Sequence, residues 1–349
     1  MDELVLTGSN RVRFPGISSR AYEHPTDRGA LVALRAVPGF DAVLRSLAGA
    51  IGDRAERLLY LSSAVRVGPA QYPRLAAVRD ECVSTLDLPE VPDLFVYRSP
   101  EAEAMTIGMD RPFVVLSTGL VQLLDEDGLR FVIGHELGHV LSGHAVYRTM
   151  LVRLIRLTQS MAWMPVGYWG LRAVVAALRE WYRKSELSCD RAGLLCGQDP
   201  RAALRTHALL AGAVDPAAVH VPSFLRQAQE YSAVPDVRES MLKLLQTMDA
   251  THPMPVVRAA ELQKWAAGPE YRAILSGDYP RRADDPATGF AAEARAAAAG
   301  YRDTVRESAD PLARVVSGLG STLADAAGSV RRRLRPPGDV DEPDATPPS

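Results

Sequence analysis

Two histidines and a glutamate occur in the stretch HELGH at a spacing that suits a metal ion. His135 and His139 are four residues apart, so on an α-helix they lie on one face, about 40° apart and one turn displaced. Both imidazoles can then reach one zinc ion at roughly 2.0–2.1 Å. Glu136 points beside that ion, where its carboxylate can take a proton from the attacking water and pass it to a leaving amine. The stretch therefore predicts a catalytic zinc site with Glu136 as general base.

The residues around the motif are apolar, which argues against a chance match on a surface helix. A surface helix would carry charges between the histidines, whereas this segment has Leu137 and Gly138 there. The flanking residues are also uncharged, namely Phe131, Val132, Ile133, Val140 and Leu141. We therefore interpret the segment as a helix buried beneath a metal ion, since charged side chains are rarely buried without a partner.

His144 is a natural candidate for the third protein ligand. Nine residues separate it from His135, so a continuous helix would turn by about 900° and place it on the opposite side. Zinc enzymes with the pattern HExxHxxGxxH bring a third histidine back by breaking the helix at a glycine. Here the two diagnostic positions hold Ser142 and Ala145, and Gly143 is out of register. We expect His144 to be an ordinary helix-end residue, favoured there by its charge, and not a ligand.

A carboxylate downstream is then expected to complete the site. Glu186 and Asp190 are four residues apart in SELSCD, on a predicted helix that turns apolar immediately afterwards. One carboxylate can complete a site of two histidines and one acid, while the other accepts an N–H of a ligating histidine and fixes its tautomer. Alone, such a pair is more typical of a solvated helical face; its position after HELGH favours the metal interpretation. Cys189 lies near Glu186 around the helix, so geometry permits it as a ligand, but a small core thiol is the preferred interpretation.

The order of three motifs resembles one family of metallopeptidases. HELGH is followed about 47 residues later by ELSCD, and THP occurs at 251–253. This order resembles the M48 family of zinc metallopeptidases, the gluzincin group of CAAX prenyl proteases and HtpX-like proteases. The resemblance covers roughly residues 55–265. It implies His135, His139 and Glu186 as ligands of one zinc ion per chain, with Glu136 as the base.

The resemblance also implies roles for residues around the ligands. Asp190 would hold a ligand histidine from outside, and His252 of THP or Arg258 would stabilise the oxyanion of a tetrahedral intermediate. An extended peptide substrate would add by main-chain hydrogen bonds to an edge strand. That strand is made of Ala104, Met105, Thr106 and Ile107.

The elements that must position these residues are mostly helical. The patterning predicts an α+β fold, zincin-like, with a small β-sheet packed on the HELGH helix. Short strands are expected at 93–98, 103–109 and 112–117, and helices at 40–67, at 74–86 and across HELGH. We expect three regions: an arm with the start of the first helix (1–54), the zinc metallopeptidase domain (55–280), and a partly disordered tail rich in Ala, Arg and Pro (281–349).

Composition excludes some classes of protein. The 349 residues contain 40 Lys and Arg against 42 Asp and Glu, a net charge of −2, which argues against a nucleic-acid-binding protein. The 3 cysteines lack disulfide-framework spacing, and the N-terminal residues lack a secretory signal pattern, so a cytoplasmic protein is expected.

Two segments leave membrane contact open. The segment 150–182 is too broken by arginines, Pro165 and Gly167 to span a bilayer, and it would be a membrane-dipping hairpin, a cover over the substrate cleft or simply core. The segment 312–335 has near-helical apolar spacing and an arginine cluster, which suits an anionic inner-membrane face, a partner or a plug over the cleft.

The leading functional hypothesis is a zinc-dependent endopeptidase that hydrolyses peptide or protein substrates. The alternative is a zinc-binding scaffold or latent peptidase with a regulatory or membrane-surface role. A degenerate member would be expected to lose its base, and this chain keeps Glu136. Oligomeric state, substrate and subsite preference do not follow from the sequence.

Overall fold

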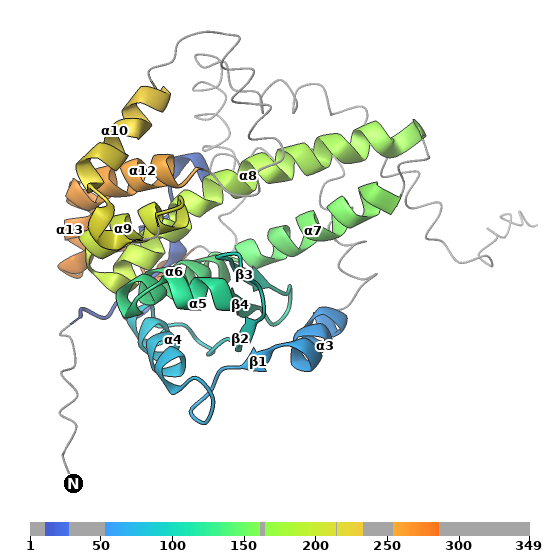
Figure 1. Cartoon of the computed structure of the whole chain (residues 1–349), viewed down its shortest axis with the longest axis horizontal. Helices are drawn as coiled ribbons and strands as arrows, with labels where there is room; N and C mark the ends of the chain where they lie inside the picture. The colour runs from blue at the N-terminus through green and yellow to red at the C-terminus, as the bar shows by residue number, and fades with distance from the viewer. Residues whose placement is uncertain (1–10, 28–52, 161–164, 214, 233–253, 286–349) are drawn as a thin grey trace, which may run out of the picture.

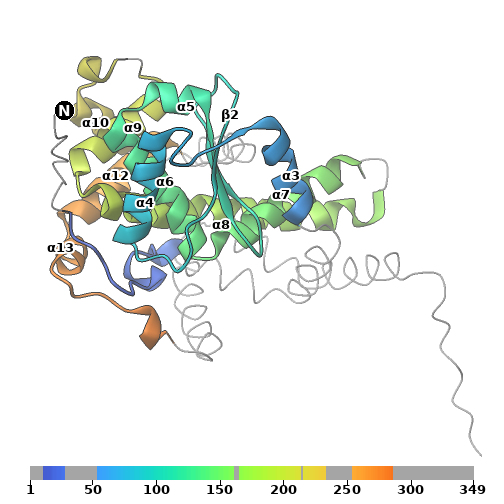
Figure 2. The same ribbon diagram turned by 90° about the horizontal axis from the view of Figure 1, so that it is seen from below.

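The chain folds into a mostly helical structure with one small mixed sheet (Figures 1 and 2). A computed structural model describes residues 11–27, 53–160, 165–213, 215–232 and 254–285. The helical elements are η1 (Ser19–Ala21), α3 (Asp53–Ser63), α4 (Pro73–Thr85), α5 (Thr118–Leu123), α6 (Glu126–Leu141), α7 (His144–Ser160), α8 (Pro165–Gly197), α9 (Pro200–Leu210), η2 (Pro216–Ala218), α10 (Val221–Ser232), α12 (Pro255–Ala267), α13 (Pro269–Leu275) and η3 (Arg282–Asp284).

The sheet has four strands in the order β1 (Val65–Arg66), β2 (Leu94–Tyr97), β4 (Phe113–Ser117) and β3 (Ala104–Ile107). β2 pairs with β4 in parallel, while β1 and β3 pair in antiparallel fashion with their neighbours. The three predicted strands are confirmed, and β3 lies at the edge of the sheet. The first predicted helix was extended too far, because the chain straightens into β1 after Ser63; residues 40–52 lie outside the described part.

Helix α6 carries HELGH and is buried along most of its length. Its start is well defined: the side chain of Asp125 accepts a hydrogen bond from the amide of Gly128, and Glu126 and Asp127 follow in the first turn, where negative charge favours a helix. One side of α6 faces β3 and β4, and the other faces α8 and α9. The helix therefore lies between the sheet and helices α8 and α9.

Close contact between α6 and α8 depends on glycines. A Cβ on Gly138 would lie 2.7 Å from Cβ of Ala192, and one on Gly134 would lie 2.6 Å from Cβ of Cys196. In the opposite direction, a Cβ on Gly193 would lie 2.6 Å from the carbonyl oxygen of Phe131. The missing side chains let the two backbones approach, which brings residues of SELSCD up to those of HELGH.

Helices α7 and α8 form a long antiparallel pair that extends to one side of the sheet (Figure 1). The segment 150–182 is divided between these two helices, and Pro165 stands at the first position of α8, where a proline fits without losing a hydrogen bond. Within the described residues, no helix combines the length and the hydropathy needed to cross a bilayer. The 312–335 segment lies outside the described part.

The N-terminal arm packs into the main core. Phe14, Ile17 and Tyr22 are completely buried and belong to the same apolar cluster as residues of α4, α6 and α8. Ile17 also pairs with Arg281, so the start of the arm and the end of the described chain lie side by side. A smaller apolar cluster of Phe95, Phe113 and Val115 lies in the sheet, with Tyr60 of α3 against it.

Candidate metal centre

The structure brings His135, His139 and Glu186 together in the buried contact between α6 and α8. Nε2 of His139 lies 3.2 Å from Oε1 of Glu186, and Nε2 of His135 lies 3.5 Å from Oε2. All three side chains are almost fully buried. Zinc bonds of about 2.0–2.1 Å at tetrahedral angles place neighbouring donors roughly 3.3–3.5 Å apart. The separations between each histidine and the Glu186 carboxylate are therefore close to those expected around one zinc ion.

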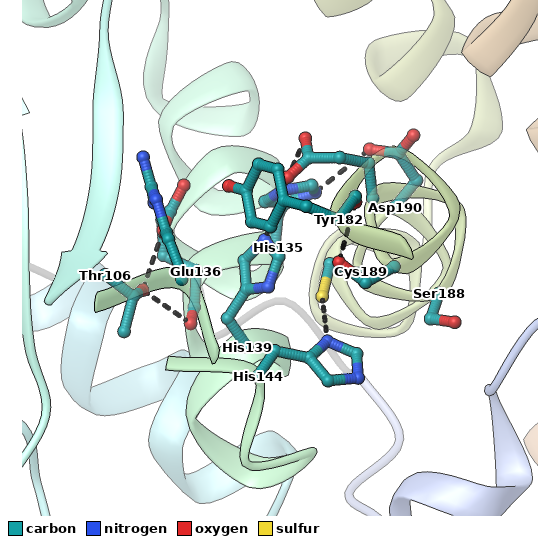
Figure 3. Close-up of polar contacts among 12 residues, drawn as sticks. Thr106, His135, Glu136, His139, His144, Tyr182, Ser188, Cys189 and Asp190 are labelled. Atoms are coloured by element: carbon teal, nitrogen blue, oxygen red, sulfur yellow. Dashed lines mark hydrogen bonds and ion pairs between the residues drawn. The ribbon is translucent and has the colours of Figure 1, made fainter. Parts of the chain in front are cut away.

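Asp190 orients His135 from the side away from Glu186. Its Oδ1 lies 3.0 Å from Nδ1 of His135, the geometry in which an outer carboxylate fixes the tautomer of a ligand histidine (Figure 3). Burial alone lowers the pKa of His135, but the carboxylates of Glu186 and Asp190 overcome it and raise the pKa to about 9. A cation is thus favoured in the site, and a metal ion would compete with this proton.

Arg258, which was predicted as a candidate for the oxyanion, contacts the acidic residues of the site. Its Nε donates to Oδ2 of Asp190 at 2.7 Å, and another guanidinium nitrogen lies 3.0 Å from Oε2 of Glu186. Despite the opposing effect of burial, this guanidinium holds the pKa of Asp190 well below its usual range. Arg258 therefore stabilises the carboxylates of the centre. His252 lies outside the described residues.

Glu136 is tethered from two other elements. The hydroxyl of Thr106, in β3, donates to Oε2 of Glu136 at 2.7 Å and also lies 3.0 Å from its carbonyl oxygen (Figure 3). A guanidinium nitrogen of Arg148, in α7, lies 3.7 Å from the same Oε2. Both contacts fall on Oε2, so within the described residues Oε1 is the oxygen left to accept a proton.

Sequence reasoning missed three residues around this centre. Tyr182 stacks on His139 with ring centroids 5.6 Å apart and an interplanar angle of 13°, and the guanidinium of Arg148 lies over Tyr182. His207 is completely buried, and its Nε2 lies 3.6 Å from Oδ2 of Asp190. A signal existed only for Tyr182, which precedes Glu186 by four residues and therefore shares its helical face.

The prediction that His144 lies on the opposite side of the HELGH helix was wrong. The chain does not run to His144 as one continuous helix, because α6 ends at Leu141 and the chain turns at Gly143, which has a φ of +69° that a glycine adopts without strain. His144 then begins α7, is 2% exposed, and its ring centroid lies 5.5 Å from that of His139. Burial lowers its pKa to about 4, so it does not provide the helix-end charge that was expected.

The chain is similar to known metallopeptidases. Residues 69–266 match the peptidase family M48. The plastoglobule-localized metallopeptidase 48 of Arabidopsis thaliana chloroplasts is 32% identical over 75% of this chain and 77% of its own length. Protease HtpX of Xylella fastidiosa strain M12 is 32% identical over 37% of this chain, and the matched part spans 44% of that protease.

A shorter match is found in the HtpX homologue of Bacillus licheniformis, which is 31% identical over 25% of this chain and 30% of its own length. No solved structure matches the chain significantly. The family match covers more than half of the sequence, including both helices of the candidate centre, and the Arabidopsis relative extends over three quarters of it. The chain belongs to peptidase family M48.

Proposed function

We propose that the protein is a zinc-dependent endopeptidase of zincin-like fold. The observation that carries this proposal is the arrangement of Glu136 on the same helix as two buried histidines that meet Glu186. One zinc ion per chain would be held by His135, His139 and Glu186. Bound there, it would polarise a scissile carbonyl and lower the pKa of a water molecule toward neutrality.

Glu136 supplies the proton transfers in this proposal. Oε1 accepts a proton from the attacking water as the water oxygen bonds to the scissile carbonyl carbon. The protonated carboxyl then gives that proton to the leaving nitrogen as the C–N bond breaks. The Thr106 hydroxyl keeps Oε2 in place, so the carboxylate does not rotate away from the reacting water.

The oxyanion requires a positive or N–H group of its own, and Arg258 is already engaged by Asp190 and Glu186. Arg148 is better placed, since it is beside Glu136 and has a terminal nitrogen without a hydrogen-bond partner among the described residues. We assign it to the oxyanion, together with His252 as the family resemblance implies.

The edge strand β3 offers a place for an extended substrate. The amide of Ser117 in β4 donates to the carbonyl oxygen of Glu103, and along an antiparallel pair every second residue bonds to the partner strand. The N–H and C=O groups of Ala104 and Thr106 are therefore directed away from β4. A peptide that adds to this edge would run along the side of the sheet next to Glu136.

The experiment compares metal content and peptide-library cleavage for the wild type and Glu136→Gln. The variant should keep one zinc ion per chain and lose cleavage by about 10²–10⁴-fold. Glu126→Gln, at the exposed start of the same helix, is the matched control and should cleave like the wild type. Cleavage retained by Glu136→Gln would exclude this mechanism, and a zinc-loaded wild type that cleaves nothing would favour the scaffold or latent peptidase.

A further inference from the structure

A second set of metal-binding atoms lies on the other side of His139. One nitrogen each of His139 and His144 and the sulfur of Cys189 all lie within 4.8 Å of one another. These side chains come from α6, from the first residue of α7 and from α8. All three are buried, and Figure 3 shows the His139 ring directed toward the Cys189–His144 pair. The endopeptidase mechanism uses neither His144 nor Cys189.

The distance between the sulfur and the nearer imidazole nitrogen suits a shared ion. Sγ of Cys189 lies 3.6 Å from Nδ1 of His144. Zinc bonds of about 2.3 Å to sulfur and about 2.0–2.1 Å to nitrogen, at a tetrahedral angle, separate the two donors by roughly 3.5–3.6 Å. Sγ of Cys189 and Nδ1 of His144 can therefore bind one ion at their present separation.

His139 has a nitrogen available for this position. Its Nε2 faces Glu186, whereas its Nδ1 is buried and has no hydrogen-bond partner among the residues that the structure describes. Buried polar atoms are seldom left unsatisfied in proteins, and binding an ion is one way in which such an atom is satisfied. One nitrogen of His139 thus faces Glu186, and the other is available to a second group of ligands.

His144 has the outer carboxylate that is typical of a metal ligand. Its Nε2 lies 3.4 Å from Oδ2 of Asp27, and the hydroxyl of Ser188 donates to the same oxygen at 2.6 Å. This leaves Nδ1 of His144 directed at Cys189. The arrangement repeats that of His135, whose Nδ1 contacts Asp190 while Nε2 faces Glu186.

We propose that His139, His144 and Cys189 form a second metal position, which takes a thiophilic divalent ion such as Zn²⁺ or Cd²⁺. Cys189 binds as the thiolate and releases its proton to solvent. When both positions are filled, the ring of His139 bridges the two ions and its Nδ1 proton is released as well. The second ion therefore binds more weakly than the first. It joins α6, α7 and α8 and, through Asp27, the N-terminal arm.

The test is a Cd²⁺ titration of the full-length protein after its metal has been removed with a chelator. Cadmium bound to a thiolate gives an ultraviolet charge-transfer absorption, which the two histidines and Glu186 cannot produce. The wild type should bind two equivalents and develop this absorption with the second. Cys189→Ser should lose the absorption and one equivalent, and His144→Asn should weaken the same equivalent. Cys82→Ser, which removes another buried thiol, is the control and should behave like the wild type.

The outcomes separate this proposal from the proposed function. Glu186→Ala should lose the first equivalent and keep the charge-transfer absorption. A wild type without the absorption at excess Cd²⁺ would overturn the second position, as would an absorption that persists in Cys189→Ser; neither result depends on peptidase activity. Circular dichroism checks that each variant is folded, and the wild-type titration decides the proposal even if a variant is not.

Discussion

Arg258 and Asp190 form a buried ion pair in which the guanidinium contacts both carboxylate oxygens. The same carboxylate contacts Nδ1 of His135, so Arg258 on α12 reaches a candidate ligand on α6 through a residue of α8. A guanidinium in this position fixes the orientation and charge of the acidic residues. This relationship links α12 to the candidate metal centre.

Replacing Arg258 should destabilise the protein even without metal. Arg258→Ala leaves the carboxylates of Asp190 and Glu186 buried without this cation, so it should cost about 3–5 kcal/mol in the free energy of unfolding. Urea unfolding of the chelator-treated protein measures this loss, with Arg282→Ala as a control in a more exposed ion pair. A role confined to the oxyanion would instead lower cleavage and leave metal-free stability unchanged.

Thr106 should affect the base and not the metal. Thr106→Val keeps the shape of the side chain but removes the hydroxyl that holds Oε2 of Glu136, so kcat should fall roughly tenfold. Thr106→Ser restores a hydroxyl and should recover most of the activity. Zinc content, measured in the same preparations, should stay at the wild-type value; a drop in zinc would mean that the hydroxyl supports the ligands instead.

Arg148 should contribute to catalysis through its charge. Arg148→Met keeps much of the apolar stem and removes the guanidinium beside Glu136, so kcat should fall by about 10²-fold if it stabilises the oxyanion. Arg148→Lys keeps the charge but not the planar guanidinium group, so its kcat should lie between those of the wild type and Arg148→Met. Steady-state kinetics on one peptide gives kcat and KM separately. A rise in KM alone would assign Arg148 to substrate binding.

The glycines between α6 and α8 should couple packing to the site. Gly138→Ala places a methyl group 2.7 Å from Cβ of Ala192 and should cost about 1–3 kcal/mol in the free energy of unfolding. Ala192→Gly removes the opposing methyl, so the double variant should be more stable than the sum of the single effects predicts. Chemical unfolding of the wild type, the two single variants and the double variant measures this coupling energy. If the two single effects on the free energy of unfolding simply add, the contact between positions 138 and 192 does not cause the loss of stability.

The metal-free protein should lose stability in mild acid. Burial lowers the pKa values of His139, His144 and His207 to about 4 from the ordinary value of 6.5. Between these values the unfolded chain binds protons that the folded protein does not, so the free energy of unfolding falls as the pH falls from about 6.5 to about 4. The pKa of His135 is instead raised to about 9, so its contribution to the free energy of unfolding changes only above pH 6.5. Urea midpoints across this range test the slope, and His207→Gln should reduce it.

Helical periodicity was sufficient to predict how HELGH and SELSCD present their side chains. Residues four apart share a face of any α-helix, so the pairing of His135 with His139, and of Glu186 with Asp190, follows from local geometry. The three strands followed equally from short apolar runs bounded by turn residues. Their role as ligands and substrate edge stays a prediction, which the experiments above address.

The tertiary structure alone decided what surrounds these residues. His144 lies close to His139, and not on the far side of one continuous helix as predicted. The reason is the turn at Gly143, which separates the end of α6 from the start of α7. Arg258 contacts Asp190, and Thr106 contacts Glu136, across separations of 68 and 30 residues. Such contacts depend on how helices and strands pack, and the spacing of residues along the chain contains no information about them. The sequence by itself thus determined the chemistry of the candidate ligands and base, whereas packing decided which side chains orient them.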